Sequence, residues 1–214
     1  MDQQFLDSMR VRLAGRTKRQ LIEEMIVRSP HVGAKEKLHL ALQEYPLFLL
    51  MMARDYPTKI WILDKGERPT SADILSDGAR QRRWHSRGIH LDQCDGVVDV
   101  IDNYVAMVVS WKTLLIIRHE FAHVVTTFFS PKTRSQLAAL FEKAKMRNYF
   151  VEPLAAESLG EYLACAMSFY FFPDLREDLR TVDPDLHTLV GGILAEAEEI
   201  SAQISSVPAG VAGA

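Results

Sequence analysis

The sequence has few of the features that assign a chain of 214 residues to a specialised class of protein. It contains only two cysteines, Cys94 and Cys165, which excludes a disulfide framework and indicates two free, packed thiols. The formal net charge is −3, so no excess of basic residues points to nucleic acid or to an anionic membrane surface. Composition therefore gives no reason to expect either partner.

A long uninterrupted apolar run is also missing. The most apolar segment, Leu114 to Phe129, contains Arg118 and three further ionisable residues, so we do not expect it to span a bilayer. The N-terminal stretch MDQQFLDSMRVRLAGRTKRQ carries charges where a secretory signal peptide has its apolar core. We therefore expect a protein that is cytoplasmic or is exported by a non-classical route.

The composition otherwise matches an ordinary globular protein, with 48% apolar and 25% charged residues. The length suits one domain, or one domain with an N-terminal extension. We expect a helical extension over residues 1–32, a main domain over residues 33–204 and a disordered tail over residues 205–214.

Hydrophobic periodicity and turn residues predict helices towards both ends of the chain and strands between them. The expected helices cover residues 34–56 with a bend at Pro46, 111–129 with Ser110 as N-cap, 130–146, 152–172 and 184–204. The expected strands cover residues 58–66, a short stretch at 89–91 and, most clearly, 104–109. Helices, then strands, then helices make an α+β pattern and not an alternating βαβ one. The long segment 66–95 is expected to form a flap over a cleft.

The segment LLIIRHEFAHVVTTFF places three ionisable side chains in an otherwise apolar helix. His119 and His123 are four residues apart, so both imidazoles project from one helix face and can bind one Zn²⁺. Glu120 lies about 100° further round the helix, where it faces a water molecule on the metal and not the metal itself. Zinc lowers the pKa of such a water towards about 7, and a neighbouring carboxylate can accept its proton. The H-E-x-x-H pattern therefore predicts two metal ligands and a general base.

A third ligand is expected downstream of this helix. A structural zinc site takes four protein ligands, usually several cysteines, whereas a catalytic site takes three and keeps an open position. The segment EPLAAESLGEYLACA offers Glu152, Glu157 and Glu161. We assign Glu157 as the third ligand, with Glu161 one helical turn later accepting the other ring N–H of a ligand histidine. Gly160, between the two carboxylates, would allow the two helices to approach closely.

The combination of HEFAH with a later E-x-x-x-E on an aromatic-rich helix resembles the anthrax lethal factor-like metallopeptidases, whose clan includes the Pro-Pro endopeptidases. A weaker likeness extends over residues 35–199. The resemblance implies a zincin-like fold, in which a small mixed sheet packs on the HExxH helix and a Glu-bearing ligand helix. It implies a gluzincin-type site with His119, His123 and Glu157 as ligands and Glu120 as base. It also implies a tyrosine that stabilises the oxyanion, for which Tyr149 is the nearest match, one residue out of register.

The leading expectation is therefore a zinc endopeptidase that binds one zinc ion per chain and acts on a protein or peptide substrate. An extended substrate is expected to pair with an exposed edge of the strand at residues 104–109. One alternative is a regulatory peptidase like the HExxH enzymes that cleave phage-type repressors. Those enzymes carry an acidic third ligand before a small-residue helix that ends in proline, as EYLACAMSFYFFP does here. A second alternative is a non-catalytic zinc-binding interaction module, in which Glu120 would be dispensable.

Overall fold

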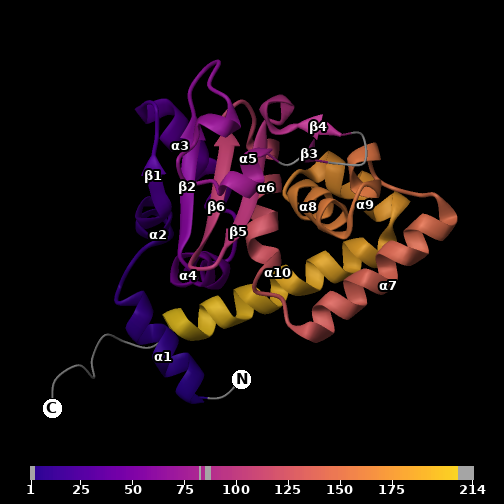
Figure 1. The fold of residues 1–214 in the computed structure, drawn as a ribbon. Helices are drawn as coiled ribbons and strands as arrows, with labels where there is room; N and C mark the ends of the chain where they lie inside the picture. The colour runs from indigo at the N-terminus through magenta and orange to yellow at the C-terminus, as the bar shows by residue number, and fades with distance from the viewer. Residues whose placement is uncertain (1–2, 82, 85–87, 207–214) are drawn as a thin grey trace, which may run out of the picture.

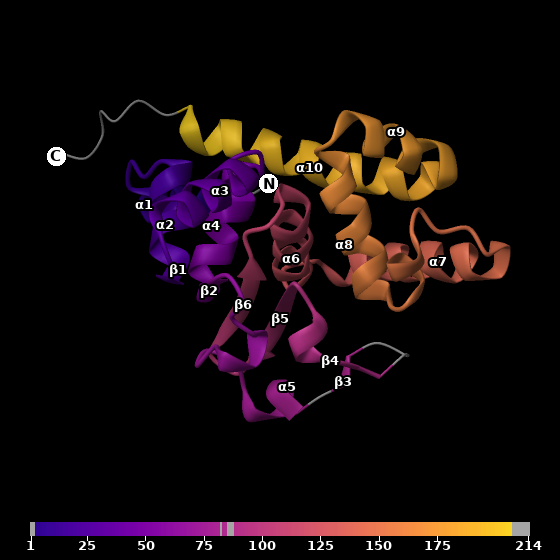
Figure 2. The same ribbon diagram turned by 90° about the horizontal axis from the view of Figure 1, so that it is seen from above.

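The computed structural model describes residues 3–81, 83–84 and 88–206, and it has a mixed sheet with helices on one face and an irregular segment on the other (Figures 1 and 2). The α+β class predicted from the sequence is confirmed. The sheet consists of β1 (Ile26–Arg28), β2 (Thr58–Leu63), β5 (Gly96–Ile101) and β6 (Tyr104–Ser110).

The strands lie in the order β1-β2-β6-β5. The first three are parallel, whereas β5 runs antiparallel to β6 after a tight turn at Asp102 and Asn103. The strand β6 is central and is buried from Val105 to Ser110, which fits its run of Val, Ala and Met. The expectation that this strand offers an exposed edge is therefore wrong, because β5 covers that edge and is itself the edge strand.

The helical layer forms because apolar stripes of consecutive helices cover one face of the sheet and each other. Its helices are α1 (Gln3–Leu13), α2 (Lys18–Met25), α3 (Val32–Leu42), α4 (Leu47–Asp55), α6 (Leu114–Thr126), α7 (Pro131–Arg147), α8 (Leu159–Tyr170), α9 (Pro173–Val182) and α10 (Pro184–Ser205). The bend expected at Pro46 is a full break, and Pro46 is the N-cap of α4. Of the helices described, none has the length and apolar character needed to cross a membrane.

Residues 1–32, expected to form a helical extension, also contribute a strand to the sheet. In this region β1 pairs in parallel with β2, and Leu21, Ile22 and Met25 are fully or almost fully buried in the same core as β6 and α6. The N-terminal region is thus continuous with the rest of the fold. Of the expected tail, residues 207–214 lie outside the described residues.

The described part of residues 66–95, here called the cover segment, includes residues that pack on the outer face of the sheet, opposite α6 (Figure 2). The segment contains α5 (Asp77–Gln81), β3 (Arg83–Trp84) and β4 (Ile89–His90), and two short 3-10 turns at Pro69–Ser71 and Leu91–Gln93. Its Leu75 and Leu91 are buried with Val108 of β6. The segment expected to form a flap therefore covers the sheet, and of its described residues the last three line the cleft described below.

Candidate metal centre

Helix α6 carries the H-E-x-x-H residues and begins one turn later than expected. Ser110 is the last residue of β6, and Thr113 is the N-cap, with its Oγ1 accepting a hydrogen bond of 3.1 Å from the amide of Ile116. Residues Ile117, Phe121, Val124 and Val125 of α6 are fully buried. This apolar face fixes the helix in the core, so its polar face is held towards α8 and β5.

A cleft of about 500 Å³ lies beside α6. Its walls come from the edge strand β5, from α6, from the turn that precedes α8, and from α8 itself. The lining includes His119, Glu120, His123 and Glu161, together with apolar residues Val98, Val100, Ile116, Leu154 and Phe169. Four of the predicted site residues thus line the cleft, three of them on α6 and Glu161 on α8.

The donor atoms of His119, His123 and Glu161 converge. The two Nε2 atoms are 3.2 Å apart, Glu161 Oε2 is 2.9 Å from His119 Nε2, and Oε1 is 3.6 Å from His123 Nε2. Donor atoms bound tetrahedrally to one zinc ion at 2.0–2.1 Å lie about 3.3 Å from each other. The shortest distances between the three groups are close to that value, with Glu161 facing each histidine through a different oxygen.

The electrostatics of Glu161 agree with this arrangement. Burial would raise the pKa of this carboxyl group, whose side chain is 14% exposed, but the close rings of His119 and His123 hold the pKa well below its usual range. Although Oε2 lies 2.9 Å from His119 Nε2, it is buried and accepts no well-directed hydrogen bond within the described residues. An ionised carboxylate with an unsatisfied buried oxygen is suited to a cation at this point.

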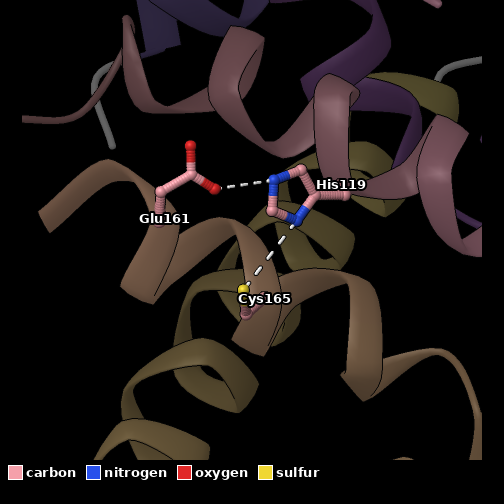
Figure 3. A group of neighbouring side chains, drawn as sticks. All are labelled: His119, Glu161 and Cys165. Carbon is pink, nitrogen blue, oxygen red and sulfur yellow. Dashed lines mark hydrogen bonds and ion pairs between the residues drawn. The ribbon is translucent and has the colours of Figure 1, made fainter. Parts of the chain in front are cut away.

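Cys165 also lies beside His119, but on the other side of the ring (Figure 3). Its Sγ is 3.9 Å from Nδ1, whereas Glu161 faces Nε2. His119, Glu161 and Cys165 are close enough to be considered as one metal-binding group. We favour the set with His123, because a single ion cannot bind both ring nitrogens of His119. Burial and a hydrogen bond to Glu152 raise the pKa of Cys165, which keeps the thiol neutral.

Glu120 is 8% exposed and lies beside the convergent donors without joining them. Burial raises its pKa to about 7, while the neighbouring His119 lowers it and the charge of Glu161 raises it further. A carboxyl group with a pKa near neutrality can both accept and return a proton, which is the property of an efficient general base. The geometry is compatible with the role predicted for Glu120.

Glu157 does not take the position expected from the sequence. Helix α8 begins after its N-cap Ser158, whose Oγ accepts a hydrogen bond of 3.1 Å from the amide of Glu161. Glu157 therefore lies before the helix, at the end of a 3-10 turn, and Glu157 and Glu161 do not share a helix face. The residues described as lining the cleft include Glu152 and Glu161 but not Glu157. The S-x-x-E pattern of Ser158 to Glu161 is the sequence signal that would have located this helix start.

Tyr149 lies directly after helix α7. It follows Asn148, the left-handed C-cap of α7, and its partly buried ring lies 5.9 Å from the guanidinium of Arg147. The described lining of the cleft does not include Tyr149. The next residue, Phe150, packs against Phe141 and Tyr162. The oxyanion role predicted for Tyr149 finds no support in this arrangement.

Two neighbours of the site were missed from the sequence. The first is Gly96, which lies at the start of β5 directly against the side chain of Glu120. Gly160, by contrast, was expected at a close approach of α6 and α8, and it lies against the ring of His123. The second is Cys165, which was interpreted from the sequence as a packing residue and lies beside Nδ1 of His119. Cys165 lies one helical turn after Glu161 on α8, and this spacing is the signal that could have indicated its contact. No local pattern indicates the contact of Gly96, because it joins segments far apart in the chain.

No protein-family model matches the chain, and no curated protein matches it at a significant level of similarity. The likeness to lethal factor-like metallopeptidases therefore rests on the sequence motifs alone.

Proposed function

We propose that the protein is a zinc-dependent endopeptidase in which His119, His123 and Glu161 bind the metal and Glu120 is the general base. The observation that carries this proposal is the convergence of the two Nε2 atoms and the Glu161 carboxylate, 2.9–3.6 Å apart, at the wall of a cleft. Glu161 takes the ligand role that the sequence had suggested for Glu157.

The residues of the chain divide the chemistry among them. A bound zinc ion would polarise a substrate carbonyl and lower the pKa of a water molecule. Glu120, which lies beside the donors, would accept the proton of the attacking water and pass it to the leaving amine. Cys165 lies next to Nδ1 of His119. When the ring proton is on Nδ1, the lone pair of Nε2 is free to bind the metal on the side of Glu161 and His123.

The substrate class follows from the edge strand. The free edge of β5 presents backbone N–H and C=O groups with no strand partner among the described residues, and β5 lines the cleft. An extended peptide can add to such an edge as a further strand. Val98 and Val100, which alternate with Asp99 along β5, line the same cleft and would provide apolar contacts for the side chains of the bound peptide.

A second candidate function is favoured by the position of Glu161. This carboxylate lies in the first turn of α8, three residues before the small-residue stretch Ala164 to Ala166, and Pro173 follows the helix. That order is the one noted above for HExxH peptidases that cleave phage-type repressors. The substrate would then be a DNA-binding protein, and the chemistry at the site would be the same.

The proposal is tested by elemental analysis of the purified chain together with a cleavage assay. We expect about one zinc ion per chain and cleavage of a mixed peptide library, detected by mass spectrometry, that stops with a chelator and returns with zinc. A folded helix-turn-helix repressor added as a separate substrate distinguishes the two candidates. A chain that holds no zinc after zinc is resupplied would rule out both, whereas zinc without any cleavage would indicate a binding module.

A further inference from the structure

Strand β5 and helix α6 approach each other closely where Gly96 contacts Glu120. A Cβ atom placed on Gly96 would lie 2.5 Å from Cγ of Glu120 and 2.6 Å from both its Cδ and its Oε1. Real Cβ atoms essentially never lie under 3.0 Å from another heavy atom. The side chain of Glu120 therefore occupies space that any residue other than glycine would fill.

The reason for glycine here is space and not backbone conformation. Gly96 does not have a positive φ, so another residue could adopt the same backbone angles. The strand is fixed on this side, since Gly96 pairs with Val109 and the amide of Ser110 donates a 2.7 Å hydrogen bond to the carbonyl of Asp95. Helix α6 is equally fixed by its fully buried Ile117 and Phe121.

The group best able to move is thus the side chain of Glu120 itself. All three of the closest atoms belong to that side chain and none to the backbone. Rotation about its side-chain bonds would relieve the clash, but it would carry the carboxyl group away from its buried place beside His119. A displacement of about 1 Å in a reacting group can lower a rate by about 100-fold.

We infer that Gly96 is a positioning residue for Glu120, because its missing side chain leaves the space in which the carboxyl group is held beside His119 and Glu161. The effect on rate rests on the function proposed above. The steric relation between the two residues does not, and it can be tested without any activity.

The chain offers a matched control in Gly160. A Cβ atom at this position would lie 3.5 Å from Nδ1 and 3.6 Å from Cε1 of His123, which is ordinary van der Waals contact. Gly160 is neither a proposed ligand nor among the residues that line the cleft. Gly160→Ala therefore makes the same chemical change at the same centre without a clash.

The first test compares crystal structures of the metal-free Gly96→Ala and Gly160→Ala proteins. We expect the Glu120 carboxyl group to move by more than about 1 Å in Gly96→Ala, with β5 in place, and to keep its position in Gly160→Ala. A Gly96→Ala structure in which Glu120 stays and β5 shifts would overturn the inference. This result is independent of whether the protein cleaves peptides.

The second test measures kcat, KM and zinc content. Gly96→Ala should lower kcat about 100-fold with KM and zinc content unchanged, whereas Gly160→Ala should stay within about two-fold of the wild type. In a Glu120→Ala background, Gly96→Ala should cause no further loss, because the clashing atoms are gone. An equal loss in both backgrounds would mean that Gly96 does not act through Glu120, and would overturn the inference.

Discussion

Glu120 on α6 and Glu161 on α8 are buried carboxyl groups of the same cleft, but their surroundings shift the pKa in opposite directions. Burial raises the pKa of both. Glu161 faces the Nε2 atoms of His119 and His123, which more than offset burial, whereas Glu120 lies against the backbone of Gly96. The comparison shows how two identical side chains near one histidine are suited to different tasks, one as a ligand and one as a base.

The largest expected effect separates these tasks. Glu120→Gln removes the proton acceptor but keeps the shape of the side chain, so cleavage should fall by about 10²–10⁴-fold while about one zinc ion per chain remains. Mass spectrometry of peptide products and elemental analysis of the same preparation measure both quantities. Loss of zinc from Glu120→Gln would instead make Glu120 a ligand and end the comparison.

The complementary variant is Glu161→Gln, with Glu157→Gln as its matched control four residues away. Glu161→Gln should weaken zinc binding by more than about 100-fold. That loss would exceed the one typical of residues that only hydrogen-bond to a metal ligand. Glu157→Gln should change the zinc affinity by less than about three-fold. Competition with a chromophoric chelator gives both affinities. The reverse ranking would restore Glu157 as the third ligand.

The opposite pKa shifts also predict opposite effects of pH on the metal-free protein. Below about pH 4.5 the Glu120 carboxyl group is protonated in both the folded and the unfolded state, and its burial has no ionic cost. As the pH rises from about 4.5 to about 7, the unfolded state ionises first and the wild type loses stability. Glu120→Gln escapes this loss, so its free energy of unfolding should exceed that of the wild type by up to about 3 kcal/mol above pH 7.

Glu161 should show the contrary sign. Its folded pKa is depressed, so it stabilises the folded state above its ordinary value of 4.5 and this contribution is lost as the pH falls. Glu161→Gln should therefore be less stable than the wild type at pH 7 and approach it in acid. Urea unfolding at several pH values with a chelator present measures both variants. Parallel curves for the two would refute the assigned environments.

The smallest effect on zinc binding is expected from Cys165, which lies beside Nδ1 of His119, on the side of the ring away from Glu161. Cys165→Ala removes the group next to Nδ1 and should weaken zinc binding about 10-fold, whereas Cys165→Ser, which keeps a polar hydrogen, should recover part of the loss. Ser168→Ala is a suitable control, because Ser168 is buried one turn later and bonds only to the carbonyl of Cys165 among the contacts described. Equal affinity in Cys165→Ala and the wild type would reduce Cys165 to a packing residue.

Local signals in the sequence predicted much of this architecture. The apolar run around His119 and His123 predicted a buried helix with its polar groups on one side, and Ser130 with Pro131 correctly predicted the start of α7. The strand at residues 58–63 and the last helix were also predicted within a few residues. Each of these depends on neighbours within one or two turns of the chain.

Most of the errors concern relations between distant segments, and one, the place of Glu157, concerns a local helix cap. Whether the strand at residues 104–110 is central or at the edge depends on how β5 pairs, and both orders fit the same apolar pattern. The place of Glu157 depended on where α8 begins, which Ser158 decides through a cap. The contact of Gly96 with Glu120 exists only after β5 and α6 have packed, so no local pattern carries it.

The cover segment has a consequence for how the cleft moves. The hydroxyl of Tyr104 donates a 2.8 Å hydrogen bond to the carbonyl of Ile74, and the amide of Ser76 donates one of 3.0 Å to Asp99 Oδ2 on β5. The same segment ends in Gln93, Cys94 and Asp95, which line the cleft. Cover and edge strand are thereby joined into one cooperative unit of local unfolding. The amide hydrogens of the described residues in both should therefore exchange with solvent together, so that opening of the cleft wall beside Glu120 requires opening of the outer face of the sheet as well.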